Sequence, residues 1–163
     1  MKENFKLSEL PYSRIRIEGF EKEAENIIRK FKEAKSGEEQ FSVHKEYYTL
    51  IKKVRTTMTL AGLRFSGDMS NKFYEEEQNY YDEIAPKIES FEAKYKKLIF
   101  ESEFRPYLEE KLGKVAFKNI ELQLKSFDDV LIPLKQEENA LVSKYNKLIA
   151  QTTMEFRGET LNL

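Results

Sequence analysis

Apolar residues recur every three or four positions over long stretches of this 163-residue sequence, and only six glycines and four prolines interrupt it. This spacing places apolar side chains on one face of an α-helix. Because so few residues break helices, the sequence predicts a mostly α fold, an antiparallel bundle of long helices. The predicted helices cover residues 17–34, 38–65, 71–101, 105–112, 114–125 and 129–151.

The second, third and last of these helices carry similar apolar seams, with spacings that alternate between three and four residues. One helix packs along another through such a seam. Pro86 falls inside the third helix and is expected to kink it, because proline removes a backbone hydrogen bond. The seam positions are Tyr47, Ile51, Val54, Met58, Ala61 and Phe65 in the second helix, Phe73, Glu77, Tyr81, Ile84, Ile88, Phe91, Tyr95 and Leu98 in the third, and Leu131, Leu134, Glu138, Leu141, Tyr145 and Leu148 in the last.

The end of the sequence differs from the helices. Residues 152–156 and 160–163 alternate polar and apolar side chains around a turn-like Arg157-Gly158-Glu159, which predicts a C-terminal β-hairpin. A lone hairpin is marginal in water, and the sequence stops where its second strand would still be running. We therefore expect that the natural continuation is missing and that the unpaired edge promotes a homo-oligomer. Alternatively, the hairpin folds back on Tyr145 and Leu148 and leaves a monomer.

The charge balance excludes several classes of protein. The sequence has 28 Lys and Arg against 29 Asp and Glu, a net charge of −1, which argues against nucleic acid or a membrane surface as partner. It has no cysteine, hence no disulfide or thiolate metal site. No apolar run approaches the roughly 20 residues that span a bilayer, and no signal peptide is evident. The simplest interpretation is a single helical domain, residues 1–163, of a soluble cytoplasmic protein.

The sequence offers few groups for catalysis or metal binding. His44 is the only histidine, and the preferred interpretation is a helix residue without a chemical role. Glu75-Glu76-Glu77, followed by Asp82, suggests a carboxylate metal site, but such helical sites use Glu-x-x-His pairs, and Phe41 stands three residues before His44. A solvated acidic face is the preferred interpretation. No catalytic, cofactor-binding or metal-ligating residue is predicted in this chain.

Three groups of tyrosines leave two interpretations open. Tyr47-Tyr48 and Tyr80-Tyr81 are adjacent pairs, and Tyr74 stands alone. In each pair one ring faces the seam and the other points elsewhere. A tyrosine outside the core can line a wall that binds peptides, because its ring is apolar and its tip is polar. Simple packing is the preferred interpretation.

An ordered series of short motifs resembles one family over essentially the whole chain. Residues 58–86, MTLAGLRFSGDMSNKFYEEEQNYYDEIAP, are similar to the N-terminal part of an oligoendopeptidase F-like (thimet-type) zinc metallopeptidase. Residues 10–14, 33–40, 121–125 and 155–163 follow the same family in the expected order. The sequence departs from it at Ile15, where the family often has proline.

The resemblance implies the N-terminal lobe of a hinged, mostly helical peptidase that hydrolyses short oligopeptides in a deep channel. The family's zinc-binding His-Glu-x-x-His helix would lie in the C-terminal two-thirds, which this sequence lacks. The implied partners are the remainder of the peptidase chain and, in the full enzyme, short peptides; zinc is implied for the full-length enzyme only. The chain alone would then be inactive. The alternative is a stand-alone helical binding or assembly protein, and a carboxylate-bridged metal oxidase is a third hypothesis.

Overall fold

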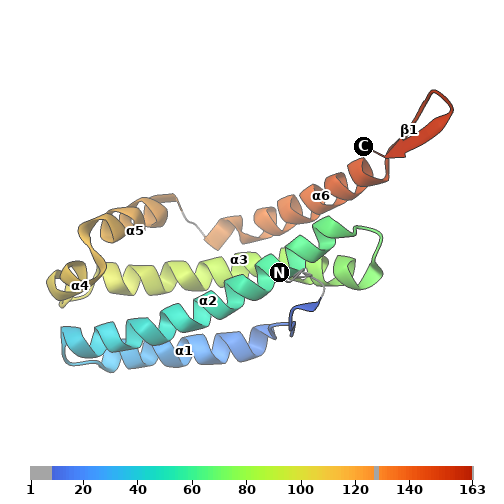
Figure 1. The fold of residues 1–163 in the computed structure, drawn as a ribbon. Coiled ribbons are helices and arrows are strands. Elements are labelled where there is room, and N and C mark those ends of the chain that lie inside the picture. Colours follow the sequence, from blue (N-terminus) through green and yellow to red (C-terminus); the bar gives the residue numbers. More distant parts are fainter. Residues whose placement is uncertain (1–8, 127–128, 163) are drawn as a thin grey trace, which may run out of the picture.

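The computed structural model describes residues 9–126 and 129–162, and it is mostly helical, as the sequence predicts (Figure 1). Each predicted helix is present, with ends that agree within a few residues. None of the helices in the described ranges is both long enough and apolar enough to cross a membrane. The elements are α1 (Ile17–Glu33), α2 (Gly37–Gly67), α3 (Lys72–Phe100), α4 (Arg105–Leu112), α5 (Lys114–Ser126), the short 3-10 helix η2 (Asp129–Leu131), α6 (Ile132–Gln151), β1 (Thr153–Phe156) and β2 (Glu159–Asn162).

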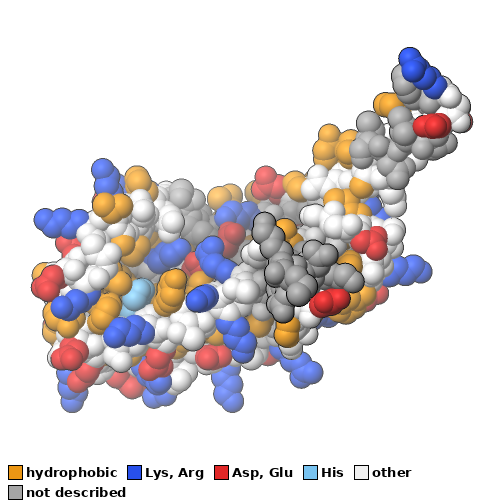
Figure 2. All heavy atoms as spheres, viewed as in Figure 1, with side chains coloured by type: hydrophobic (Ala, Val, Ile, Leu, Met, Phe, Trp, Pro, Cys, Tyr) orange, Lys and Arg blue, Asp and Glu red, His pale blue; other side chains and the backbone are white. Residues whose placement is uncertain are grey.

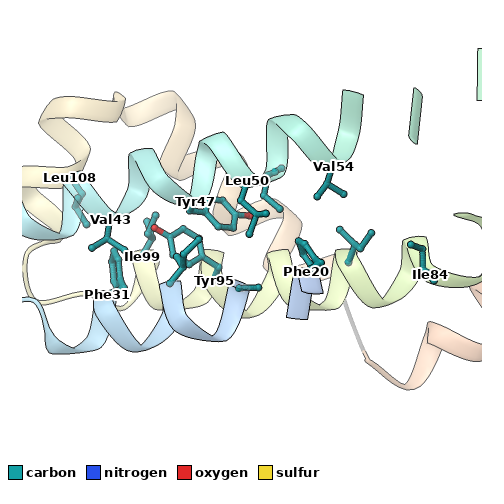
Figure 3. Packing of buried hydrophobic residues seen from close by; sticks show 14 of the residues in the cluster. Phe20, Phe31, Val43, Tyr47, Leu50, Val54, Ile84, Tyr95, Ile99 and Leu108 are labelled. Carbon is teal, nitrogen blue, oxygen red and sulfur yellow. The ribbon is translucent and has the colours of Figure 1, made fainter. Parts of the chain in front are cut away.

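The helices α1, α2 and α3 pack side by side and enclose the hydrophobic core (Figures 1 and 3). Tyr95 lies at its centre with its side chain fully buried. Its ring stacks on Tyr47 with 3.7 Å between the ring centroids, and Phe31 meets it edge-on. Burial raises the pKa of both tyrosines. Leu108 of α4 and Phe117 of α5 close one end of the core. The predicted seams of the second and third helices therefore form most of the core, but the prediction is wrong at Phe73, which is 50% exposed.

An extended segment before α1, here called the N-terminal clasp (residues 10–16), binds the start of α3. The carboxylate of Glu77 accepts hydrogen bonds from the Tyr12 hydroxyl and from the Arg14 guanidinium, whose Nε lies 2.8 Å away. The hydroxyl of Tyr80 donates to the carbonyl of Ile15 at 2.7 Å. Glu77 is only 3% exposed, so these donors compensate the cost of burying its charge.

The helix α6 lies along α3 at the position of the proline. The helix α3 continues through Pro86, which has no N–H to donate to the carbonyl of Asp82. The side chain of Asn139 donates to that carbonyl at 3.3 Å, and Gln136 donates to the neighbouring carbonyl of Glu83 at 2.6 Å. The proline thus leaves the Asp82 carbonyl available on α3, and the amide side chain of Asn139 satisfies it.

The strands β1 and β2 pair antiparallel, with Thr153 opposite Asn162. The turn between them has positive φ at Arg157 (53°) and Gly158 (83°), which is typical of the two-residue turn that matches the twist of a hairpin. This hairpin projects from the end of α6, away from the helical bundle (Figure 1).

Candidate functional site

The helix α6 has no buried residue. Its large apolar side chains stand exposed on one side, here called the outer face of α6, and Figure 2 shows hydrophobic atoms along this arm of the molecule. The seam predicted for the last helix therefore does not pack into the core, which corrects that expectation. The hypothesis that the hairpin folds back on Tyr145 and Leu148 is also wrong, since both stay exposed at 62% and 63%. The outer face consists of Leu134, Leu141, Val142, Tyr145, Leu148 and Ile149, and Met154 of β1 is exposed beyond it.

Polar contacts on the opposite side of α6 fix this orientation. Ser143 donates to the Asp82 carboxylate, Lys147 pairs with Glu75, and Lys135 pairs with Glu89 at 2.8 Å. At about 100° per residue, these side chains fall on the side of the helix opposite the outer face. Since α3 binds the polar side, the apolar side turns toward solvent.

A hollow of about 590 Å³ adjoins the outer face, between the end of α2, the start of α3 and α6. Phe65 contributes an apolar wall, Asn79 a polar one, and Leu141 and Leu148 border it from α6. Protein interfaces usually combine an exposed apolar patch with such a recess, which accepts a side chain of the partner.

The acidic run of α3 is structural. Glu77 is buried against the N-terminal clasp, Glu75 pairs with Lys147, and only Glu76 is exposed. The expectation of a wholly solvated acidic face is therefore wrong at two of three positions. Asp82 is half-buried; burial raises its pKa, while the hydrogen bonds from Ser143 and Gln78 act in the opposite direction.

His44 lies on α2 among the core tyrosines. Its Nδ1 is 3.4 Å from the Tyr95 hydroxyl, and its ring stacks with those of Tyr47 and Tyr95. Burial lowers its pKa. Within the described part of the chain, no three His, Cys, Asp or Glu side chains are grouped closely enough to hold a metal ion. His44 is thus a packing residue in this arrangement.

In each tyrosine pair, the ring on the predicted seam is the more deeply buried one. Tyr47 and Tyr81 are buried, Tyr80 is half-buried against the N-terminal clasp, and Tyr48 is 62% exposed on α2. Tyr48 borders a mainly apolar hollow of about 550 Å³ on α2. The interpretation as packing residues therefore fits Tyr47 and Tyr81. The interpretation as part of a groove wall fits Tyr48.

Comparisons with known proteins agree on one family. The model of the Peptidase M3 N-terminal domain matches residues 7–127. The solved structure of PZ peptidase A with inhibitor 2 is 32% identical, with a TM-score of 0.93 over 96% of this chain. A protein from Bacillus anthracis str. Ames, described as an oligoendopeptidase F, is 32% identical, with a TM-score of 0.91 over 95% of this chain. A further oligoendopeptidase F structure is 32% identical, with a TM-score of 0.93 over 96%.

These relatives are much longer than this chain, which spans 28% of the length of each. No curated protein sequence matches the chain. The likeness therefore covers nearly all of this chain and the corresponding part of the larger proteins.

Proposed function

Since the chain belongs to the M3 peptidase family as an N-terminal domain, we propose that it serves as the N-terminal lobe of a zinc metalloendopeptidase that hydrolyses short oligopeptides. The lobe forms part of the wall of the peptide channel, and the remainder of the peptidase supplies the catalytic groups. On this proposal the 163-residue chain is inactive by itself.

The outer face of α6 carries this proposal. Six large apolar side chains lie exposed on one side of a 20-residue helix that has no buried residue. Water solvates such a patch poorly, and contiguous apolar patches of this kind mark interfaces. The occupant that we propose is the remainder of the peptidase, because relatives of the same fold are more than three times as long, as the 28% coverage indicates. In the isolated chain, this face and the hairpin bring two copies together.

The residues described here do not fit a catalytic zinc ion. Zinc sites in peptidases require several nitrogen or carboxylate ligands, whereas His44 is the only histidine and no suitable cluster occurs among residues 9–126 and 129–162. The zinc and its ligands therefore belong, on this proposal, to the part of the protein outside this sequence.

A stand-alone helical binding or assembly protein is the second candidate. The same outer face of α6 supports it, since that face would receive a partner in either case. The two candidates differ in the partner: the first requires a C-terminal peptidase part, and the second binds a different protein and gains no activity.

Reconstitution tests the proposal. The C-terminal part of an oligoendopeptidase F, carrying His-Glu-x-x-His, is expressed separately and mixed with this chain, and cleavage of a quenched fluorescent peptide is measured. We expect activity only in the mixture. Leu141→Glu with Leu148→Glu should abolish it, whereas Val115→Glu, on the exposed surface of α5, should not. Cleavage by the chain alone after repurification, or full activity with the α6 variant, would contradict the proposal.

A further inference from the structure

Three hollows meet at one arginine on α2. The first, of about 550 Å³, lies on the outward side of α2; the second, of about 200 Å³, lies between α2 and α3; and the third, of about 240 Å³, lies where α3, α5 and α6 approach one another. Arg55 lines all three, and Thr59 lines the first two. The three adjoining hollows, here called the groove, are apolar along α2 and charged at the end near α5.

A buried carboxylate holds this arginine in place. Arg55 Nε donates to Glu92 Oε1 at 3.1 Å, and Arg55 Nη2 donates to both carboxylate oxygens at 2.9 and 2.8 Å. The side chain of Glu92 is 5% exposed, whereas that of Arg55 is 62% exposed. Lys96 Nζ also contacts Glu92, at 3.1 Å. Such forked contacts fix the plane of a guanidinium.

The fixed guanidinium retains donor capacity toward the groove. Arginine has five N–H donors, and the bonds to Glu92 use only Nε and Nη2, so Nη1 makes no hydrogen bond within the described part of the chain. Of the charged residues that line the groove, Lys52, Arg55, Lys96 and Lys135 are cations, and Glu89 and Glu92 are anions, which leaves two net positive charges. The groove thus offers a positive site that suits a carboxylate.

We propose that Arg55 binds the C-terminal carboxylate of a short extended peptide whose apolar side chains lie in the α2 hollow. Tyr48, Leu60 and Leu63 are among the apolar walls of that hollow. From Arg55 to Leu63 the helix extends about 12 Å at about 1.5 Å per residue. An extended chain that ends at Arg55 covers that length with about four residues, so the hollow holds the last four residues of the peptide. Glu92 is the positioning residue for Arg55.

This groove is separate from the outer face of α6. Among the described residues, Lys135 is the one α6 residue that lines any of the three hollows, and it belongs to the polar side of the helix. A partner that covers the outer face therefore leaves the groove open. The inference rests on the proposed function for its substrate class, but its test uses binding to this chain and needs no reconstituted activity.

The test compares two probes on the full chain. The hexapeptide Ala-Leu-Phe-Ala-Leu-Ala, with a dye on its N-terminus, is prepared as the free acid and as the C-terminal amide, and binding is followed by fluorescence polarisation. We expect the free acid to bind about tenfold more tightly, as a charge-assisted hydrogen bond implies. In the Arg55→Gln variant, the affinity for the free acid should fall to the affinity for the amide. Arg29→Gln changes a surface arginine of α1 and should leave the difference between acid and amide unchanged.

Further variants separate this role from a purely structural ion pair. Arg55→Lys keeps the charge and should keep a smaller preference for the acid. Glu92→Gln leaves Arg55 charged but less well oriented, so the preference should fall without being lost. Equal binding of acid and amide by the unmodified chain, no binding at millimolar peptide, or an undiminished preference in a folded Arg55→Gln variant would overturn the proposal. None of these results decides the outcome of the reconstitution experiment, because that experiment measures peptide cleavage and not peptide binding to this groove.

Discussion

The helices α2 and α6 carry similar apolar seams in sequence but occupy opposite environments in the structure. On α2 the seam residues Tyr47, Ile51 and Val54 are buried among α1 and α3. On α6 the seam residues Leu141 and Leu148 stand in solvent, and that helix has no buried position. Periodicity therefore identifies a face that will pack, but it does not say whether the packing partner lies within the same chain.

The difference arises from the polar side of each helix. Asn139 of α6 satisfies the Asp82 carbonyl that the proline of α3 leaves available, Gln136 donates to the neighbouring carbonyl of Glu83, and Lys147 pairs with Glu75. These contacts bind the polar side of α6 to α3, so its apolar side cannot reach the core. We infer that the core of α1 to α3 stabilises this chain, whereas the outer face of α6 binds a partner.

A matched pair of leucine substitutions should show a large difference in stability between the core and the outer face of α6. Leu108 is fully buried and Leu148 is 63% exposed. Leu108→Ala should lower the free energy of unfolding by about 2–5 kcal/mol because it leaves a cavity. Leu148→Ala should change it by less than about 0.5 kcal/mol. Urea unfolding at a protein concentration low enough to keep the chain monomeric measures both, and equal losses would remove the distinction between the two regions.

The N-terminal clasp should behave as part of the stable region. Glu77→Gln weakens the charged hydrogen bonds from Arg14 and Tyr12, and we expect a loss of about 1–2 kcal/mol in unfolding free energy. The exposed neighbour Glu76 provides the control, since Glu76→Gln should cost less than about 0.5 kcal/mol. If both variants unfold at the same urea concentration, the clasp does not contribute to stability.

A substitution that weakens the attachment of α6 to α3 should have a smaller effect on stability, and the effect should be confined to α6. Asn139→Ala removes the donor to the carbonyl of Asp82, which should weaken the attachment by about 1 kcal/mol. Amide hydrogen exchange should become faster in α6 and remain unchanged in α1. Asn146→Ala, at an exposed position of α6, is the matched control. If amide exchange became faster to the same extent in all helices, α6 would not detach from α3 independently of the rest of the fold.

The smallest expected effect is a dependence of stability on pH. Burial lowers the pKa of His44 from its usual 6.5, so the folded state binds the proton less well than the unfolded chain. The stabilisation is therefore complete above about pH 6.5 and is lost as the pH falls below it. Asp82 has a raised pKa and acts in the opposite direction, so the comparison must be made between variants. Urea midpoints of His44→Gln should fall less between about pH 7.5 and 5.5 than those of the unmodified chain; an equal fall would exclude His44 as the cause.

Much of the fold could be predicted from the sequence because its local signals agree. The helices follow from the apolar spacing and the few glycines and prolines, and the hairpin follows from the turn at Arg157-Gly158. The predicted ends of these elements lie within a few residues of the observed ends. The side chains that join distant segments could not be predicted this way. Glu77 is paired with Arg14, which is 63 residues away in sequence, and the pairing of Arg55 with Glu92 spans 37 residues.

The solvent exposure of the outer face of α6 does not follow from the sequence, for a related reason. A seam such as Leu134, Leu141 and Leu148 has the same pattern whether its partner is in the chain or outside it. One signal was present in the sequence: Pro86 inside the third helix implies an unsatisfied carbonyl at Asp82, and amide side chains at a matching spacing on another helix are candidates to satisfy it.

Hydrogen exchange on the complex shows whether the outer face of α6 is covered by the remainder of the peptidase. Amide exchange is measured for this chain alone and after addition of the separately expressed C-terminal part of an oligoendopeptidase F. If the outer face of α6 is the interface, exchange slows in α6 and in the strands that follow it, while α1 keeps the rates of the isolated chain. Slowed exchange confined to α1, or no change in α6 despite demonstrated binding, would contradict the account.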